Sequence, residues 1–143
     1  MNTATARYAG HLRTEAIHTA SGNAIQTDAP VDNHGRGEAF SPTDLVSTAL
    51  GACMMTIIGI VAERHQWELV GSTFAVVKHM SPDAPRRIAQ IDVTFSLPAV
   101  LAPADRVLLE RAAHTCPVSL SLHPEVRQNI VFNYEEVAAA VAK

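Results

Sequence analysis

The chain has 143 residues, of which 48% are hydrophobic and 17% charged, and its formal net charge at pH 7 is −3. This length is typical of one globular domain with its own core, so we expect a single domain over residues 1–143. The composition excludes disordered, collagenous and coiled-coil chains, and without a basic excess nucleic acid is not an expected partner.

The chain contains two cysteines, Cys53 and Cys116, too few for a small disulfide-stapled scaffold. The N-terminus lacks the charged start and apolar run of a signal peptide. We therefore expect a cytoplasmic protein whose thiols are reduced unless they form a transient, catalytic bridge.

Weak alternation of apolar and polar residues over residues 3–19 predicts one strand. The turn residues at 21–23 are followed by a short returning strand at 24–27. Residues 28–40 contain the proline, glycine, aspartate and asparagine residues that are typical of a loop.

A helix is predicted from Ser41 to about Gln66. Ser41 suits the N-cap and Pro42 the first helical position, and Asp44 lies three residues after the cap, as in a capping box. Residues 46–62 carry no charge and are just long enough to span a membrane, but the rest of the chain reads as a soluble sheet protein. We therefore expect a buried central helix and no membrane partner.

A helix that is apolar all round needs cover on more than one side. Small residues on it recur at steps of three and four, at Ala49, Ala52, Thr56 and Gly59. Such a stripe lets a second backbone approach closely, so we infer packing against the same helix of a second copy, in a homodimer.

The remaining elements are predicted from periodicity. They are a strand at 67–80, a half-buried antiparallel strand at 87–97, a helix at 103–115, a short helical turn at 117–122 and a strand at 126–134. Apolar residues on both faces of 67–80 favour a central strand, Val107 and Leu108 fall at helical spacing, and residues 135–143 are either helical or frayed. This order predicts an α+β fold with antiparallel sheet.

The two cysteines are the candidates for chemistry. Cys53 lies about three turns into the central helix, where a cysteine can also be a small buried hydrophobe. Cys116 precedes Pro117 and is the expected N-cap of the short helix, where free N–H groups lower a thiol pKa; a buried structural cysteine is the alternative. If the two thiols meet, their chemistry is that of a two-cysteine peroxidase.

Two other chemistries are less favoured. His114, Cys116 and His123 match no standard zinc spacing and lack a fourth ligand, and a cysteine–histidine hydrolase lacks an orienting acid. We therefore expect no metal and no cofactor.

Two motifs carry a resemblance to a known family. The segment from Phe40 to Cys53, FSPTDLVSTALGAC, is similar to the helix opening of the OsmC/Ohr family, the osmotically inducible and organic hydroperoxide resistance proteins. The segment from Arg111 to Ser119, RAAHTCPVS, resembles that family's second cysteine motif, and both motifs occur in the family's order.

The resemblance implies an OsmC-like α+β fold, with antiparallel sheets around a long buried central helix in an intertwined homodimer. It implies that Cys53 is the peroxidatic cysteine and Cys116 the resolving one. The implied activity is the reduction of organic hydroperoxides in a stress response. The implied reductant is an external dithiol, which is lipoyl in some members.

The sequence departs from the hydroperoxide-resistance pattern after the helix-opening proline. Where those members carry a glutamate that holds the catalytic arginine, this chain has Thr43, so it resembles more closely the OsmC-like branch of predicted redox proteins. The candidates for the carboxylate are Asp44 and Glu38, and those for the arginine are Arg13 and Arg36, with His18 a further neighbour. The alternative function is a homodimeric protein of the same fold that binds a small apolar ligand beside Cys53 without efficient peroxide turnover.

Overall fold

The structure is a computed structural model that describes residues 1–136. The chain divides into two compact units, Met1–Val46 and Ser47–Lys143. The expectation that residues 1–143 form one domain stays a prediction. Of the tail expected to be helical or frayed, Glu135 ends the last strand, and residues 137–143 lie outside the described residues.

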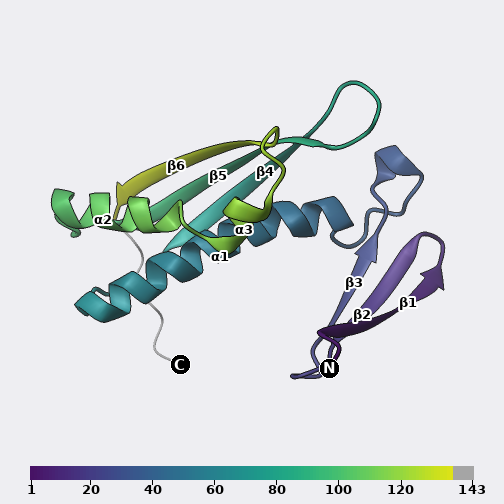
Figure 1. Ribbon diagram of the computed structural model, residues 1–143, viewed down its shortest axis with the longest axis horizontal. Helices are drawn as coiled ribbons and strands as arrows, with labels where there is room; N and C mark the ends of the chain where they lie inside the picture. The colour runs from purple at the N-terminus through teal and green to yellow at the C-terminus, as the bar shows by residue number, and fades with distance from the viewer. Residues whose placement is uncertain (137–143) are drawn as a thin grey trace. The chain divides into compact units, whose positions relative to one another are not determined.

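The first unit is a three-stranded antiparallel sheet of β1 (Ala4–Gly10), β2 (Arg13–His18) and β3 (Ala24–Asp28), in that order, followed by a short 3-10 turn, η1 (Val31–Asn33) (Figure 1). The single strand predicted over residues 3–19 is therefore wrong, because the chain reverses between β1 and β2. His11 and Leu12 form that turn with φ of 53° and 63°, as a type I′ hairpin requires at both central positions. The Leu12 N–H donates to the Tyr8 hydroxyl at 3.2 Å.

The second sheet is ordered β4-β5-β6, with β4 at Thr73–Met80, β5 at Ile88–Pro98 and β6 at Arg127–Glu135. In the sequence, β5 and β6 are separated by the helices α2 (Pro103–Ala113) and α3 (Pro117–Ser121). This crossover brings β6 back parallel to β5, whereas β4 and β5 are antiparallel. The prediction of a purely antiparallel sheet is wrong for this pair, and the strand predicted to be central lies at the edge, with β5 in the centre.

The long helix α1 spans Pro42–His65. Its start confirms the predicted capping box: the Asp44 N–H donates to Ser41 Oγ at 3.0 Å, and the Ser41 N–H donates to the Asp44 carboxylate at 3.0 Å. These local bonds fix where the helix begins, and Cys53 follows about three turns later.

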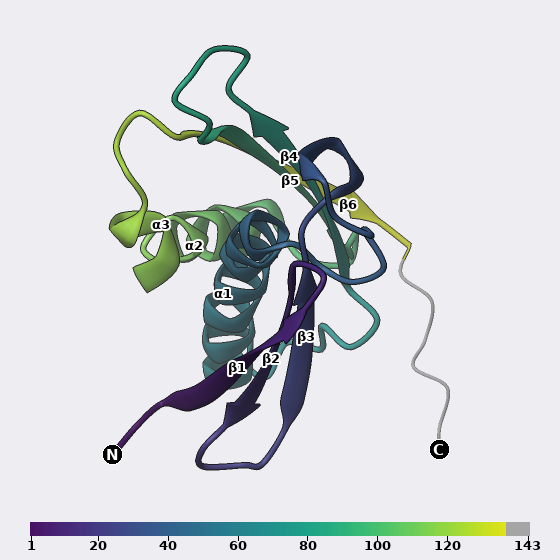
Figure 2. The same cartoon turned by 90° about the vertical axis from the view of Figure 1, so that its right-hand side faces the viewer.

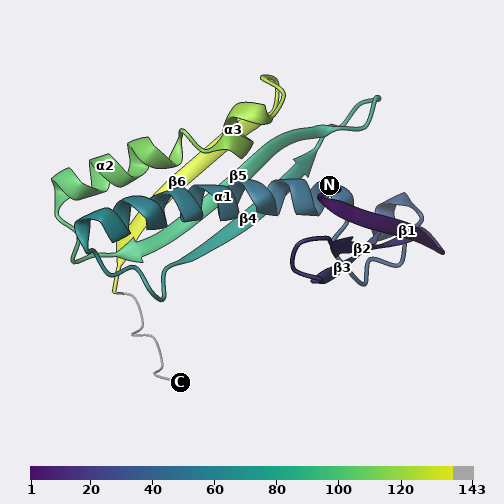
Figure 3. The same cartoon turned by 60° about the horizontal axis from the view of Figure 1, so that its bottom comes forward.

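In the second unit, α1 and α2 lie on the same face of the β4-β5-β6 sheet (Figures 2 and 3). At Gly51 an added Cβ would come 2.6 Å from the Phe74 ring, so only glycine allows α1 to approach β4 this closely. The half-buried strand predicted at 87–97 is confirmed, because alternate residues of β5 are buried. On α2, Val107 and Leu108 are exposed, whereas Leu109 and Ala113 face the core. The core residues are Leu50, Met54, Ile58, Ile91, Val93, Phe95, Leu97, Leu101, Leu109, Ala113 and Cys116.

Only one face of α1 is buried within the chain, and the expected cover of its other faces by a second copy stays a prediction. By length and composition α1 could cross a membrane, with a mean hydropathy of 2.1 over an 18-residue window, but soluble core helices satisfy the same criterion. A third of that window, 33%, is buried in the chain. Ala52, Thr56 and Ile60 are exposed, and a Cβ added at Gly59 would meet no atom within 4 Å.

Candidate functional site

The two thiols are neighbours in the core of the second unit. Cys116 is fully buried, and Cys53, on α1, is partly exposed and packs against the same core cluster. Both are free thiols. Cys53 is therefore the thiol with access to solvent, and Cys116 is the one held beside it out of solvent.

Cys116 is the N-cap of α3, as predicted, and its sulfur accepts the Ser119 N–H at 3.2 Å. The expectation that this position lowers the thiol pKa is wrong. Burial raises the pKa of Cys116, the Ser119 N–H opposes that shift, and a hydrogen bond and charge interaction with Cys53 raise it further. A buried thiol loses more from desolvation of its anion than a five-residue helix returns.

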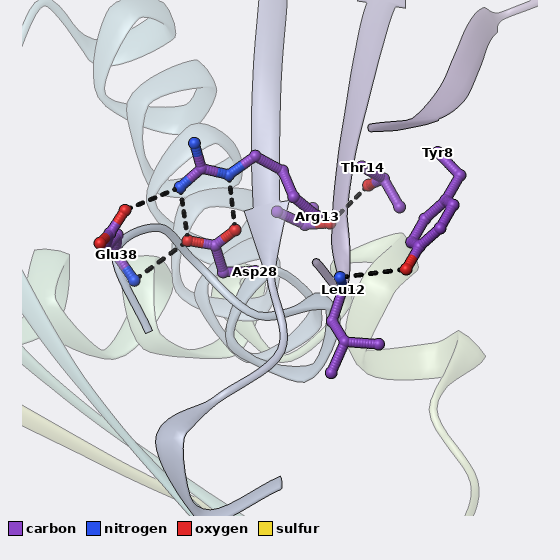
Figure 4. A network of polar contacts seen from close by, with 7 residues as sticks. Tyr8, Leu12, Arg13, Thr14, Asp28 and Glu38 are labelled. Carbon is purple, nitrogen blue, oxygen red and sulfur yellow. Dashed lines mark hydrogen bonds and ion pairs between the residues drawn. The ribbon is translucent and has the colours of Figure 1, made fainter. Parts of the chain in front are cut away.

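A second group of charged residues lies in the first unit, centred on Asp28 at the end of β3. Arg13 on β2 pairs with it in two places, Nε to Oδ1 at 2.7 Å and Nη2 to Oδ2 at 2.8 Å, and Nη2 also reaches Glu38 at 3.1 Å (Figure 4). The Glu38 N–H donates to Asp28 Oδ2 at 3.1 Å. Two parallel bonds to one carboxylate fix the plane of the guanidinium, and that geometry is available to arginine but not to lysine.

The electrostatics of this group follow from these contacts. The side chain of Asp28 is fully buried, yet the bonds from Arg13 hold its pKa below its usual range, and Arg36 adds a further lowering through its charge. The carboxylates in turn raise the pKa of Arg13. Arg13 Nη1 points away from both carboxylates and has no hydrogen-bond partner within residues 1–136 (Figure 4), so this nitrogen is available to an anion.

Most of the predicted site residues thus lie in two groups. Arg13, Glu38 and Arg36 gather around Asp28 in the first unit, and Cys53 and Cys116 meet in the second. Two other candidates lie elsewhere: Asp44 caps α1, and the His18 ring bonds to Ser21 in the hairpin loop.

Sequence reasoning missed Asp28, because an aspartate before a proline-containing segment reads as the first residue of a loop. The signal that could have found it is its register. It ends a short strand that returns antiparallel to the strand bearing Arg13, and the two residues are directly paired. Opposite charges that lie directly across a ladder stabilise a sheet, so the strand pairing makes Asp28 a candidate partner of Arg13.

The residues considered as zinc ligands make other contacts. His114 meets the Phe132 ring edge-on, and His123 Nδ1 accepts the Glu125 N–H at 3.1 Å. Within residues 1–136 no three histidine, cysteine, aspartate or glutamate side chains are grouped as a metal site.

These features define a class: an α+β protein that places two free thiols together at a long helix and fixes an arginine by a buried carboxylate. Residues 35–131 match the family described as OsmC-like protein, so the chain belongs to the OsmC-like family. The comparison with curated proteins gave no significant match.

Solved structures agree with this assignment. A protein of Psychrobacter arcticus, provisionally named an osmotic stress induced and detoxification response protein, is 44% identical with a TM-score of 0.89, over 93% of this chain and 96% of that one. The fold is shared by an organic hydroperoxide resistance protein OsmC from Legionella pneumophila, with 18% identity, a TM-score of 0.71 and coverage of 93% and 98%. It is also shared by an organic hydroperoxide resistance protein from Elizabethkingia anophelis, with 14% identity, a TM-score of 0.73 and coverage of 94% and 98%.

Proposed function

We propose that this protein is a thiol-dependent peroxidase that reduces organic hydroperoxides in the cytoplasm. The observation that carries the proposal is the pair of adjacent free thiols of unequal exposure, Cys53 partly exposed and Cys116 buried. A peroxidase of this kind needs one thiol that a substrate can reach and a second one close enough to form a disulfide.

The proposed peroxidase reaction has three steps. The Cys53 thiolate attacks the outer oxygen of the hydroperoxide, so the O–O bond breaks, Cys53 becomes a sulfenic acid and the alkoxide leaves as an alcohol after taking a proton. The Cys116 thiolate then attacks the Cys53 sulfur, so the S–S bond forms, the S–O bond breaks and water is released after protonation. An external dithiol, such as a lipoyl group, finally reduces the disulfide and is itself oxidised.

The proposed role of Arg13 is to stabilise the negative charge that develops on the peroxide oxygen. Its free Nη1 supports this role, since the other two nitrogens are occupied by carboxylates. Asp28 orients it, in the place of the glutamate that this chain lacks at Thr43. We extend the proposal to a homodimer, because the small-residue stripe of α1 is uncovered and leaves space for a second backbone.

A second candidate function is ligand binding: the protein would be a homodimer that binds a small apolar ligand beside Cys53. The observation that favours it is the charge around Arg13: two carboxylates, Asp28 and Glu38, already neutralise the guanidinium. An arginine neutralised in this way stabilises a further negative charge less than an isolated arginine does. Stopped-flow mixing of the reduced protein with cumene hydroperoxide separates the functions, because a binding protein leaves both thiols unreacted.

The role of Asp28 predicts the behaviour of Asp28→Asn. The amide is neutral and has one acceptor oxygen in place of two, so it cannot form both parallel bonds with Arg13 and the guanidinium loses its fixed plane. We expect the second-order rate with cumene hydroperoxide to fall roughly 10- to 100-fold, as for other misplaced catalytic groups. The matched control is Glu15→Gln on the same sheet, which breaks the exposed pair with Arg7 and should leave the rate unchanged. A rate for Asp28→Asn equal to or above the unmodified rate contradicts this role.

A further inference from the structure

Gln128 is a polar residue in the inward-facing row of β6, a row that continues with Ile130, Phe132 and Tyr134. A half-buried amide in such a row requires hydrogen-bond partners, since an unpaired one is costly. Both polar groups of the Gln128 amide have their hydrogen-bond partners in one residue of α3, Ser119. Ser119 Oγ donates to Gln128 Oε1 at 2.6 Å, and Gln128 Nε2 donates to the Ser119 carbonyl at 3.0 Å.

The same Ser119 contacts the buried thiol. Its N–H donates to Cys116 Sγ at 3.2 Å. Gln128 therefore holds the side chain and the carbonyl of the residue whose N–H faces the sulfur. The three residues form a continuous chain of hydrogen bonds from the sheet to the thiol, in which Gln128 bonds to Ser119 and Ser119 bonds to Cys116.

We propose that Gln128 is a positioning residue: through Ser119 it keeps an N–H on Cys116 Sγ and so assists the step in which the Cys116 thiolate attacks the Cys53 sulfenic acid. This assignment rests on the proposed function for the reaction step. A hydrogen bond to an ionised acceptor is about twice as strong as one to a neutral acceptor, so a fixed N–H favours the thiolate over the thiol. Because burial disfavours that thiolate, the N–H matters more here than at an exposed cysteine.

The test uses the full chain with Cys53→Ser, which leaves Cys116 as the sole thiol and removes the titratable group that interacts with it. With cysteine labelled at Cβ by carbon-13, the chemical shift reports the ionisation of Cys116 as pH is raised. In this background Gln128→Met, similar in length but unable to hydrogen-bond, should raise the titration midpoint by about half a unit to one unit, a roughly three- to tenfold loss of thiolate at fixed pH.

In the chain with both cysteines, Gln128→Met should slow disulfide formation after peroxide treatment by the same factor and leave the first attack by Cys53 unchanged. The matched control is Ser121→Ala, which removes a bond from the same short helix to the Pro117 carbonyl without touching Ser119 or Gln128. It should shift neither the midpoint nor the rate.

A folded Gln128→Met protein with an unchanged midpoint overturns the proposal. If that variant does not fold, the titration midpoint of Cys116 is measured in Ser119→Ala instead. This variant keeps the Ser119 N–H and loses only the hydroxyl contact with Gln128. A smaller shift in the same direction supports the positioning role, and no shift overturns it. If the midpoint shifts in the Cys53→Ser background but the unmodified chain, with both cysteines, consumes no hydroperoxide, the positioning of Cys116 stands and the peroxidase function is refuted instead.

Discussion

Replacing Cys53 by serine is expected to abolish the consumption of organic hydroperoxide. Cys53 is the partly exposed thiol and Cys116 is fully buried, so a substrate reaches Cys53 first. Burial also raises the pKa of Cys116 and leaves less of its thiolate at neutral pH, which disfavours it as the attacking group. The measurement is the loss of cumene hydroperoxide over time with excess dithiol.

The matched variant is Cys116→Ser, which keeps the attacking thiol. It should consume about one equivalent of hydroperoxide in a first burst and then stop, with Cys53 oxidising onward to sulfinic acid, because no second thiol traps the sulfenic acid. If the burst disappears in Cys116→Ser and survives in Cys53→Ser, the roles are reversed. If both variants keep full turnover, the thiols are structural and the ligand-binding function replaces the peroxidase.

The second large effect concerns assembly and is expected for Ala52→Glu. Ala52 lies in the small-residue stripe on the uncovered face of α1, where the proposed second copy would pack. A carboxylate buried there without a partner costs several kcal/mol, so the variant should aggregate or unfold rather than form a dimer. Light scattering gives the mass in solution, and circular dichroism reports whether the chain is folded.

The control for this substitution is Arg64→Gln, which changes a charge near the exposed end of the same helix and lies outside the stripe. It should remain a folded dimer, like the unmodified chain. A well-folded monomer, in the unmodified protein or in Ala52→Glu, contradicts the dimer, because it would leave the apolar face of α1 in water.

The elements that sequence predicted well are those fixed by nearby residues. The start of α1 depends on Ser41, Pro42 and Asp44, which lie within one turn, and their bonds are present in the structure. The strand at 87–97 was predicted equally well, because strict alternation of apolar and polar residues places one face of a strand inward whichever strands pair with it.

Features that depend on distant residues were harder to predict. The reversal at His11 and Leu12 lacks the glycine or asparagine that normally marks a type I′ turn, so no local signal indicated it. The parallel pairing of β5 with β6 depends on where the intervening helices pack, and alternation along a strand carries no information about its direction.

The same difference between local and distant features holds for the candidate site. The motifs around Cys53 and Cys116 identified both residues, but their adjacency was implied only by family resemblance, since 63 positions in sequence say nothing about distance in space. Arg13 and Glu38 were candidates from the start. Asp28, which joins them, became evident only when the strand pairing was known.

The proposed peroxidase reaction requires that Cys53 and Cys116 form a disulfide. Its most direct test treats the fully reduced protein with one equivalent of cumene hydroperoxide, blocks remaining thiols, and maps the peptides by mass spectrometry without reduction. We expect a linked pair of peptides, one containing Cys53 and one containing Cys116 from the same chain, with both returned to free thiols by a dithiol. Two unlinked, alkylated cysteine peptides after the hydroperoxide has been added would contradict it.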